Sequence, residues 1–153
     1  MAVKLYHFTS KRHFQEILDS GVLKVSPSNL VKPKNLHFDK TLDRWDWDTY
    51  DYKPVVWLTE SPTARDEVMQ ATGEEGSGER KDEVRIAVEK TPGMQKWTKW
   101  AEANGIDRKW FKDVKRASRD HQAWYVSEIP IPVEDFAAVE IDGEPFHAEG
   151  YRW

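Results

Sequence analysis

Two segments near opposite ends of the chain carry side chains able to do chemistry. His7 and Thr9 alternate along an apolar stretch near the N-terminus, and Glu128 ends an aromatic stretch near the C-terminus. A carboxylate at the inner rim of a sheet end lies where clefts form and where pKa values are often perturbed. A lone histidine on an apolar face is equally consistent with a hydrogen-bonded core residue, and a strand-end glutamate with a solvated one. Both interpretations stay open at this point.

Trp57 and Trp124 are a second kind of candidate, because each indole offers a flat face on which a planar ligand can stack. Aromatic rings also dominate the area that protein cores bury. The core interpretation is therefore favoured for both rings. For Trp97, Trp100 and Trp110, which recur at helical spacings, we predict core positions outright.

The strongest catalytic and binding motifs do not occur in the sequence. There is no glycine-rich phosphate loop, no dinucleotide fingerprint, no G-x-S-x-G turn and no H-E-x-x-H pair. Zero cysteines exclude disulfides, thiolate metal sites and a cysteine nucleophile. Asp43, Asp46 and Asp48 resemble a calcium loop, but the central glycine and the final glutamate are missing. We predict a solvated acidic loop there and no metal site.

Length and composition indicate one globular domain over residues 1–153. Aromatic residues make up 12% of the chain, with eight tryptophans, which argues against disorder. No stretch approaches the roughly 20 apolar residues of a membrane span, and the N-terminus has no signal-peptide pattern. We expect a soluble cytoplasmic protein with no membrane partner.

The average charge does not favour nucleic acid. The chain has 23 basic and 27 acidic side chains, a net charge of −4. A surface that binds phosphates must be basic, and this balance does not supply one on average. A local basic patch remains an alternative.

Hydrophobic periodicity predicts the elements that position these side chains. The first strand runs from Val3 to Phe8, and a helix follows with Ser10 or Thr9 at its N-cap and Gly21 at its end. Further strands are predicted at 22–25, 55–59, 83–89, 123–129 and 137–141, with helices at 62–69, along a stripe from Met94 to Ala101, and along a stripe from Trp110 to Val114.

Two segments lack any sustained period. Residues 31–54 are predicted to form a long, irregular loop rich in acidic and aromatic residues. Residues 73–82 (GEEGSGERKD) are predicted to form a flexible connector inside the domain. Because helices do not alternate regularly with strands, we predict an α+β fold, with a mixed, mostly antiparallel sheet and a few flanking helices.

Three motifs occur in an order that points to a family. Residues 5–9 (LYHFT) precede a helix and the run 17–23 (ILDSGVL), VVWLTESP follows at 55–62, and AWYVSE at 123–128. Together they resemble the ADP-ribosyltransferase superfamily, which includes bacterial DNA-modifying toxins and RNA 2′-phosphotransferases. The first block resembles the family's opening strand and helix, the second its next core strand, and the third the late strand that bears the catalytic residue.

The resemblance implies an ADP-ribosyltransferase-like fold that uses NAD as substrate and needs no metal. It places His7 against the ribose hydroxyls of NAD, with Thr9 in the same pocket. Trp57 takes the place of the ring that stacks on nicotinamide, and Thr59 adds a hydroxyl. Glu128 becomes the carboxylate that stabilises positive charge on ribose as the nicotinamide bond breaks, as in glycoside hydrolysis.

A second alignment of the late strand changes the chemistry. In some relatives the carboxylate precedes the strand, and the matching position then falls near Gln122 or Trp124, which supply no charge. Those two residues would then belong to a binding pocket with altered or lost catalysis.

Two functional hypotheses follow. The first is an enzyme that transfers ADP-ribose from NAD to an unidentified macromolecule, or cleaves NAD. The alternative is a non-catalytic binding or inhibitor protein that holds a nucleotide, or a protein partner through the acidic and aromatic stretch 39–52. RNA 2′-phosphate transfer is disfavoured, because few arginines stand at the matching positions.

Overall fold

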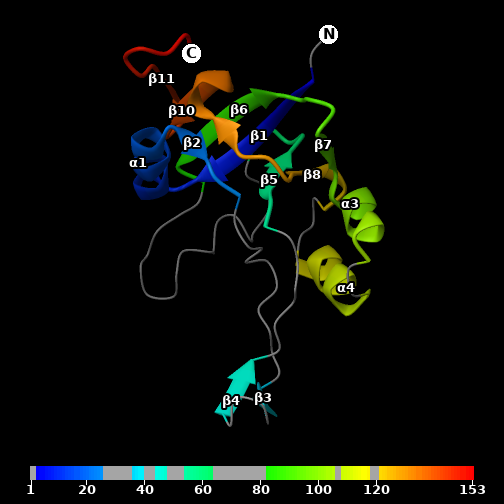
Figure 1. Cartoon of the computed structure of the whole chain (residues 1–153). Helices are drawn as coiled ribbons and strands as arrows, with labels where there is room; N and C mark the ends of the chain where they lie inside the picture. The colour runs from blue at the N-terminus through cyan, green and yellow to red at the C-terminus, as the bar shows by residue number, and fades with distance from the viewer. Residues whose placement is uncertain are drawn as a thin grey trace.

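The computed structural model describes residues 3–25, 36–39, 44–47, 54–63, 82–105, 108–117 and 121–153. Its main feature is a seven-stranded sheet in the order β11-β10-β6-β1-β5-β8-β7, in which every neighbouring pair is antiparallel (Figure 1). The strands are β1 (Lys4–Thr9), β5 (Val56–Thr59), β6 (Val84–Glu89), β7 (Met94–Lys96), β8 (Trp124–Ser127), β10 (Phe136–Ile141) and β11 (Glu144–Phe146). The predicted α+β class with a mostly antiparallel sheet is confirmed.

Two short strand pairs accompany the main sheet. β2 (Val22–Leu23) pairs with β9 (Ile131–Pro132), and β3 (Leu36–Asp39) pairs with β4 (Arg44–Trp47). The second pair shows that the prediction of irregular chain throughout 31–54 is wrong for these eight residues. The missed signal is a short alternation of apolar and polar residues in each strand, too brief to stand out beside the prolines and aspartates around it.

The first helix forms where the sequence predicts it. α1 (Lys11–Ser20) begins after Ser10, whose side chain accepts a hydrogen bond from the His13 backbone N–H. It ends at Gly21, which has φ 75° and donates to the carbonyls of Ile17 and Leu18. Both ends follow the usual capping chemistry of a side-chain N-cap and a left-handed glycine.

An ion pair fixes the start of α1 to the far end of the sheet. The Lys11 ammonium lies 2.6 Å from Asp142 and 3.7 Å from Glu83. The hydrogen bond to Asp142, together with its charge, raises the pKa of Lys11 above its ordinary value. The pair is exposed, so it orients the helix more than it stabilises the fold.

The next helices differ in part from the prediction. Met94 lies in β7 (Met94–Lys96), and α3 (Trp97–Ala103) begins only at Trp97, so the first three residues of the predicted stripe form a strand. The physical reason is that Met94 packs in the core on one face of the sheet and Trp97 in the core on the other. α4 (Arg108–Ala117) forms over the second predicted stripe. The predicted helix beyond Thr63 and the connector up to residue 81 lie outside the described residues.

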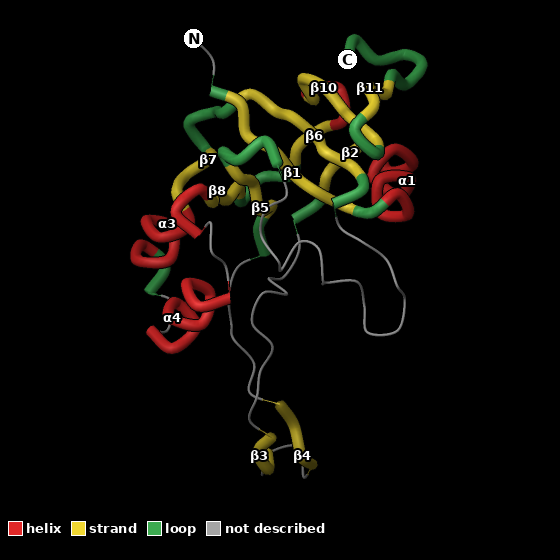
Figure 2. Tube along the Cα trace, turned by 180° about the vertical axis from the view of Figure 1, so that it is seen from behind, coloured by secondary structure: helices red, strands yellow, loops and turns green. Residues whose placement is uncertain are grey.

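The sheet separates two hydrophobic cores. The larger core combines Leu5, Val56, Ile86 and other strand residues with Phe14 and Ile17 of α1. The smaller one, here called the tryptophan cluster, consists of Val55, Trp97, Trp100, Ala101, Trp124 and Val126, with Trp57 and Phe111 packed against it. Figure 2 shows α3 and α4 together near β7 and β8, and α1 at the other side near β2.

The sheet is folded on itself at the contact between β1 and β5. Their ladder contains one residue pair, Tyr6 with Thr59. β6 and β8 are three positions apart, which in a flat sheet means roughly 14 Å. Nevertheless the Lys90 ammonium, directly after β6, lies 6.0 Å from the centre of the Tyr125 ring in β8. The two halves therefore converge around the larger core.

Replacing Gly21 by alanine tests the helix end. We expect Gly21→Ala to lower the free energy of unfolding by about 1 kcal/mol, because a Cβ disfavours the left-handed conformation. Urea denaturation measures the change. Gly93→Ala is the control, since Gly93 has no positive φ and a Cβ there would meet only Thr91 Oγ1, at 3.9 Å. Equal destabilisation of both variants would contradict this account of the helix end.

Candidate functional site

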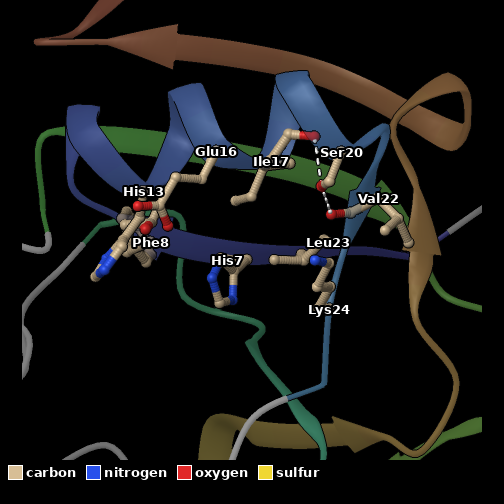
Figure 3. A pocket seen from close by; sticks show the side chains of 10 residues that line it. His7, Phe8, His13, Glu16, Ile17, Ser20, Val22, Leu23 and Lys24 are labelled. Carbon is tan, nitrogen blue, oxygen red and sulfur yellow. Dashed lines mark hydrogen bonds between the residues drawn. The ribbon is translucent and has the colours of Figure 1, made fainter.

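A cavity of about 370 Å³ opens between β1, α1 and β2, and is here called the His7 groove (Figure 3). The polar residues that line it include His7, Thr9, His13, Glu16 and Lys24. Its apolar lining includes Phe8, Ile17 and Leu23. A volume of this size and a mixed lining are typical of small-molecule sites.

His7 is held by the neighbouring strand. Its Nδ1 lies 2.8 Å from the backbone carbonyl oxygen of Trp57 in β5. A carbonyl oxygen only accepts hydrogen bonds, so Nδ1 carries the proton, and Nε2 is the basic nitrogen of the neutral ring. Figure 3 shows the ring between His13 on one side and Leu23 and Lys24 on the other. The contact with Trp57 thus sets both the orientation and the tautomer of the predicted site histidine.

Three further polar residues of the groove were not predicted from the sequence. His13 and Glu16 lie three positions apart on α1 and so share a helix face, and Lys24 follows β2. The helical stripe of His13, Glu16 and Ser20 beside buried Ile17 was the signal that could have found the first two. With His7, they give the groove three groups able to carry positive charge and one carboxylate.

The predicted aromatic residues lie on the other face of the sheet. The register pairs Trp57 with Val126 and Thr59 with Trp124, whereas His7 is paired with Ile86 of the larger core. Trp57 and Trp124 have ring centroids 6.0 Å apart, at 81° to each other. Trp124 is buried and Trp57 partly so. Both rings therefore make mainly the packing contacts of core residues.

Glu128 is positioned by the tryptophan cluster. It follows β8 on the same face as Trp124 and Val126, as strand alternation predicts. One carboxylate oxygen, Oε1, accepts a hydrogen bond of 3.0 Å from the Trp100 indole N–H. The residue is exposed and does not line the His7 groove. The structure thus brings His7 and Thr9 together in one groove, and places Glu128 with the tryptophans.

The last two predicted residues make local structural contacts. The Thr59 side chain is buried, and its Oγ1 accepts a hydrogen bond of 3.1 Å from the Ser61 N–H. Gln122 lies exposed in a single 3₁₀ turn (His121–Ala123), and its backbone carbonyl accepts 2.9 Å from the Lys96 ammonium. Neither residue lines the His7 groove.

Comparisons with protein families, with curated proteins and with solved structures found no match for this chain. Within the described residues, no group of three or more His, Asp or Glu side chains is arranged to hold a metal ion. In the same part of the chain, no helix is both long and apolar enough to cross a membrane.

A hydrogen bond between β8 and the end of β5 changes the pKa of a tyrosine. The hydroxyl of Tyr125, a buried residue of β8, donates a short hydrogen bond to the carboxylate of Glu60 after β5. That hydrogen bond, followed by burial and by the charge of Glu60, raises the pKa of Tyr125 to about 12 from its ordinary value of 10. The contact ties the two strands together beyond their ladder.

The pKa of Tyr125 can be read from phenolate absorbance during an alkaline titration. We expect one tyrosine to ionise near pH 12, and Glu60→Gln to lower that pKa. Because the folded state holds the neutral phenol, its contribution to stability is full below pH 10 and is lost as the pH rises to about 12. Glu144→Gln, at an exposed carboxylate of β11, should leave the titration unchanged. A normal Tyr125 pKa in the unaltered protein would contradict the contact.

Proposed function

We propose that this chain is an NAD-binding protein of the ADP-ribosyltransferase kind, and that part of the dinucleotide binds in the His7 groove. The observation that carries the proposal is the groove itself. The first of the three family-like motifs lines a cavity of about 370 Å³, and its histidine presents Nε2 as the basic nitrogen. Residues of the motif that carries the family resemblance in the sequence therefore also line the groove in the structure.

The groove has the chemical groups that a nucleotide needs. His7 is the residue that the resemblance places against a ribose hydroxyl, and its Nδ1–H donates to the Trp57 carbonyl. Lys24 supplies a positive charge for a phosphate, and His13 a further donor. Phe8 and Leu23 offer apolar contacts for a base or nicotinamide ring. One nucleotide half of NAD has a ribose, a phosphate and a planar ring, which match the histidine, the positive charge and the apolar side chains of the groove.

The proposed reaction breaks the bond between ribose C1′ and the nicotinamide nitrogen. Nicotinamide leaves with the bonding electron pair, positive charge develops on the ribose, and a nucleophile of the acceptor, or water, bonds to C1′. Glu128 is the proposed carboxylate that stabilises that charge. Its hydrogen bond from Trp100 would hold the carboxylate in one orientation.

A second candidate function, nucleotide binding without turnover, is favoured by one specific observation. Glu128 does not line the groove that contains His7 and Thr9. Catalysis requires a bound dinucleotide long enough to reach from the groove to Glu128, whereas binding alone requires only the groove. The two functions therefore make different predictions for Glu128.

Incubation of the purified chain with NAD, with nicotinamide release and NAD binding followed together, separates the two. We expect His7→Ala to lose both binding and release. Glu128→Gln should keep binding, while release falls by about 100-fold or more, because one stabilising charge is removed from the transition state. Glu144→Gln is the matched control at an exposed carboxylate and should behave like the unaltered chain.

Each remaining outcome selects a different account. Binding that needs His7, with no release by the unaltered chain, identifies the non-catalytic function. Release that persists in Glu128→Gln removes Glu128 from the catalytic role. An unaltered chain that neither binds nor cleaves NAD refutes the proposal as a whole.

A further inference from the structure

The helix α4 carries a stripe of positive charge. Arg108, Lys112, Lys115 and Arg116 are all exposed and occur at spacings of four, three and one, which places them on one side of the helix. Like charges three and four residues apart repel and cost helix stability. Lys115 and Arg116 also lie in the last turn, where the helix dipole favours positive charge. An anion along the stripe would relieve the repulsion between its charges.

Two basic residues elsewhere in the fold form ion pairs. Lys11 is paired with Asp142, and Arg85 lies 2.7 Å from Glu140. None of the four stripe residues has a carboxylate partner within the described part of the chain. The positive charges of α4 therefore lie together on one exposed side of the helix.

A basic pocket adjoins the stripe. A cavity of about 340 Å³ lies where β7, α4 and the turn 121–123 meet. Among the described residues, its lining includes Lys96, Lys115 and His121 and no carboxylate. The Lys96 ammonium donates to the Gln122 carbonyl and lies 5.3 Å from the centre of the Tyr125 ring, and these two contacts fix its position beside the pocket. Lys115 belongs to both the pocket and the stripe, so the two form one continuous surface.

The average charge of the chain conceals this surface. Residues 94–123 contain eight Lys and Arg and four Asp and Glu, whereas the whole chain has a net charge of −4. The folded protein is therefore basic around α3 and α4 and acidic on balance elsewhere. Such a separation of charge guides an extended polyanion to one face.

The shape of the surface favours a nucleic acid over a membrane. A ten-residue helix is roughly 15 Å long, and phosphates recur about every 3.4 Å along one strand of a duplex, so the stripe can follow several of them. A helix that binds a bilayer needs a free apolar face. In α4, the Phe111 ring packs against the protein's own core, with its centroid 4.8 Å from that of the Trp97 ring.

We propose that α4 and the pocket beside it bind the phosphate backbone of a nucleic acid, with Lys96 and Lys115 holding one phosphate in the pocket and Arg108, Lys112 and Arg116 following the strand. Recognition by these groups alone is electrostatic and does not read base sequence. The surface lies on elements other than those of the His7 groove, so the proposal does not depend on NAD binding.

Fluorescence anisotropy with labelled single-stranded and double-stranded oligonucleotides tests the proposal. Lys112→Glu/Arg116→Glu should weaken binding at low salt by about tenfold or more and flatten the salt dependence, because phosphate contacts are lost. Lys4→Glu/Arg152→Glu is the matched control, with the same change in net charge at exposed residues outside α4. Lys115→Gln should weaken binding less than the double variant. Circular dichroism establishes that each variant is folded.

Three results would overturn the proposal. The unaltered chain fails to bind either oligonucleotide at low salt. The control double variant loses as much affinity as the α4 variant, which would make binding a matter of net charge alone. Vesicles containing phosphatidylserine are bound through α4 while oligonucleotides are not, which would identify a membrane surface instead.

Discussion

The contact between β1 and β5 determines how the rest of the molecule is arranged. One ladder pair, Tyr6 with Thr59, joins two parts of a sheet that then fold around a common core. Where the ladder stops, the His7 side chain continues the connection through its hydrogen bond to the Trp57 carbonyl. A group that supports the junction in this way has its orientation and tautomer fixed before any ligand arrives, and such preorganisation is what a binding site requires.

The sheet places the two proposed sites on opposite faces. The face of the larger core, with α1, carries the His7 groove, and the face with α3 and α4 carries the tryptophan cluster, Glu128 and the basic surface of α4. In the proposed enzyme a dinucleotide would have to extend past the sheet end to reach the carboxylate. An acceptor nucleic acid lying along α4 would approach from the side of Glu128. The two proposals are thus compatible in space but rest on separate residues.

Local signals in the sequence were sufficient for individual elements. Ser10 and Gly21 mark the ends of α1 because capping depends on neighbouring residues. What could not be predicted depends on contacts distant in sequence. The division of Met94 from Trp97 depends on the two cores on opposite faces of the sheet. The separation of His7 from Glu128 and the partner of His7 depend on how distant strands pair. The groove residue Lys24 follows a two-residue strand, which leaves no periodic signal. The basic stripe of α4 was hidden by the average charge.

Mapping of NAD binding by amide chemical shifts tests the central claim most directly. A ¹⁵N-labelled chain titrated with NAD should show its largest shifts at His7, Thr9, His13 and Lys24, around the His7 groove, and these shifts should disappear in His7→Ala while the remaining spectrum stays that of a folded protein. Shifts that cluster around α4 or the C-terminal strands, with the groove unchanged, would contradict the assignment of the groove as the nucleotide site.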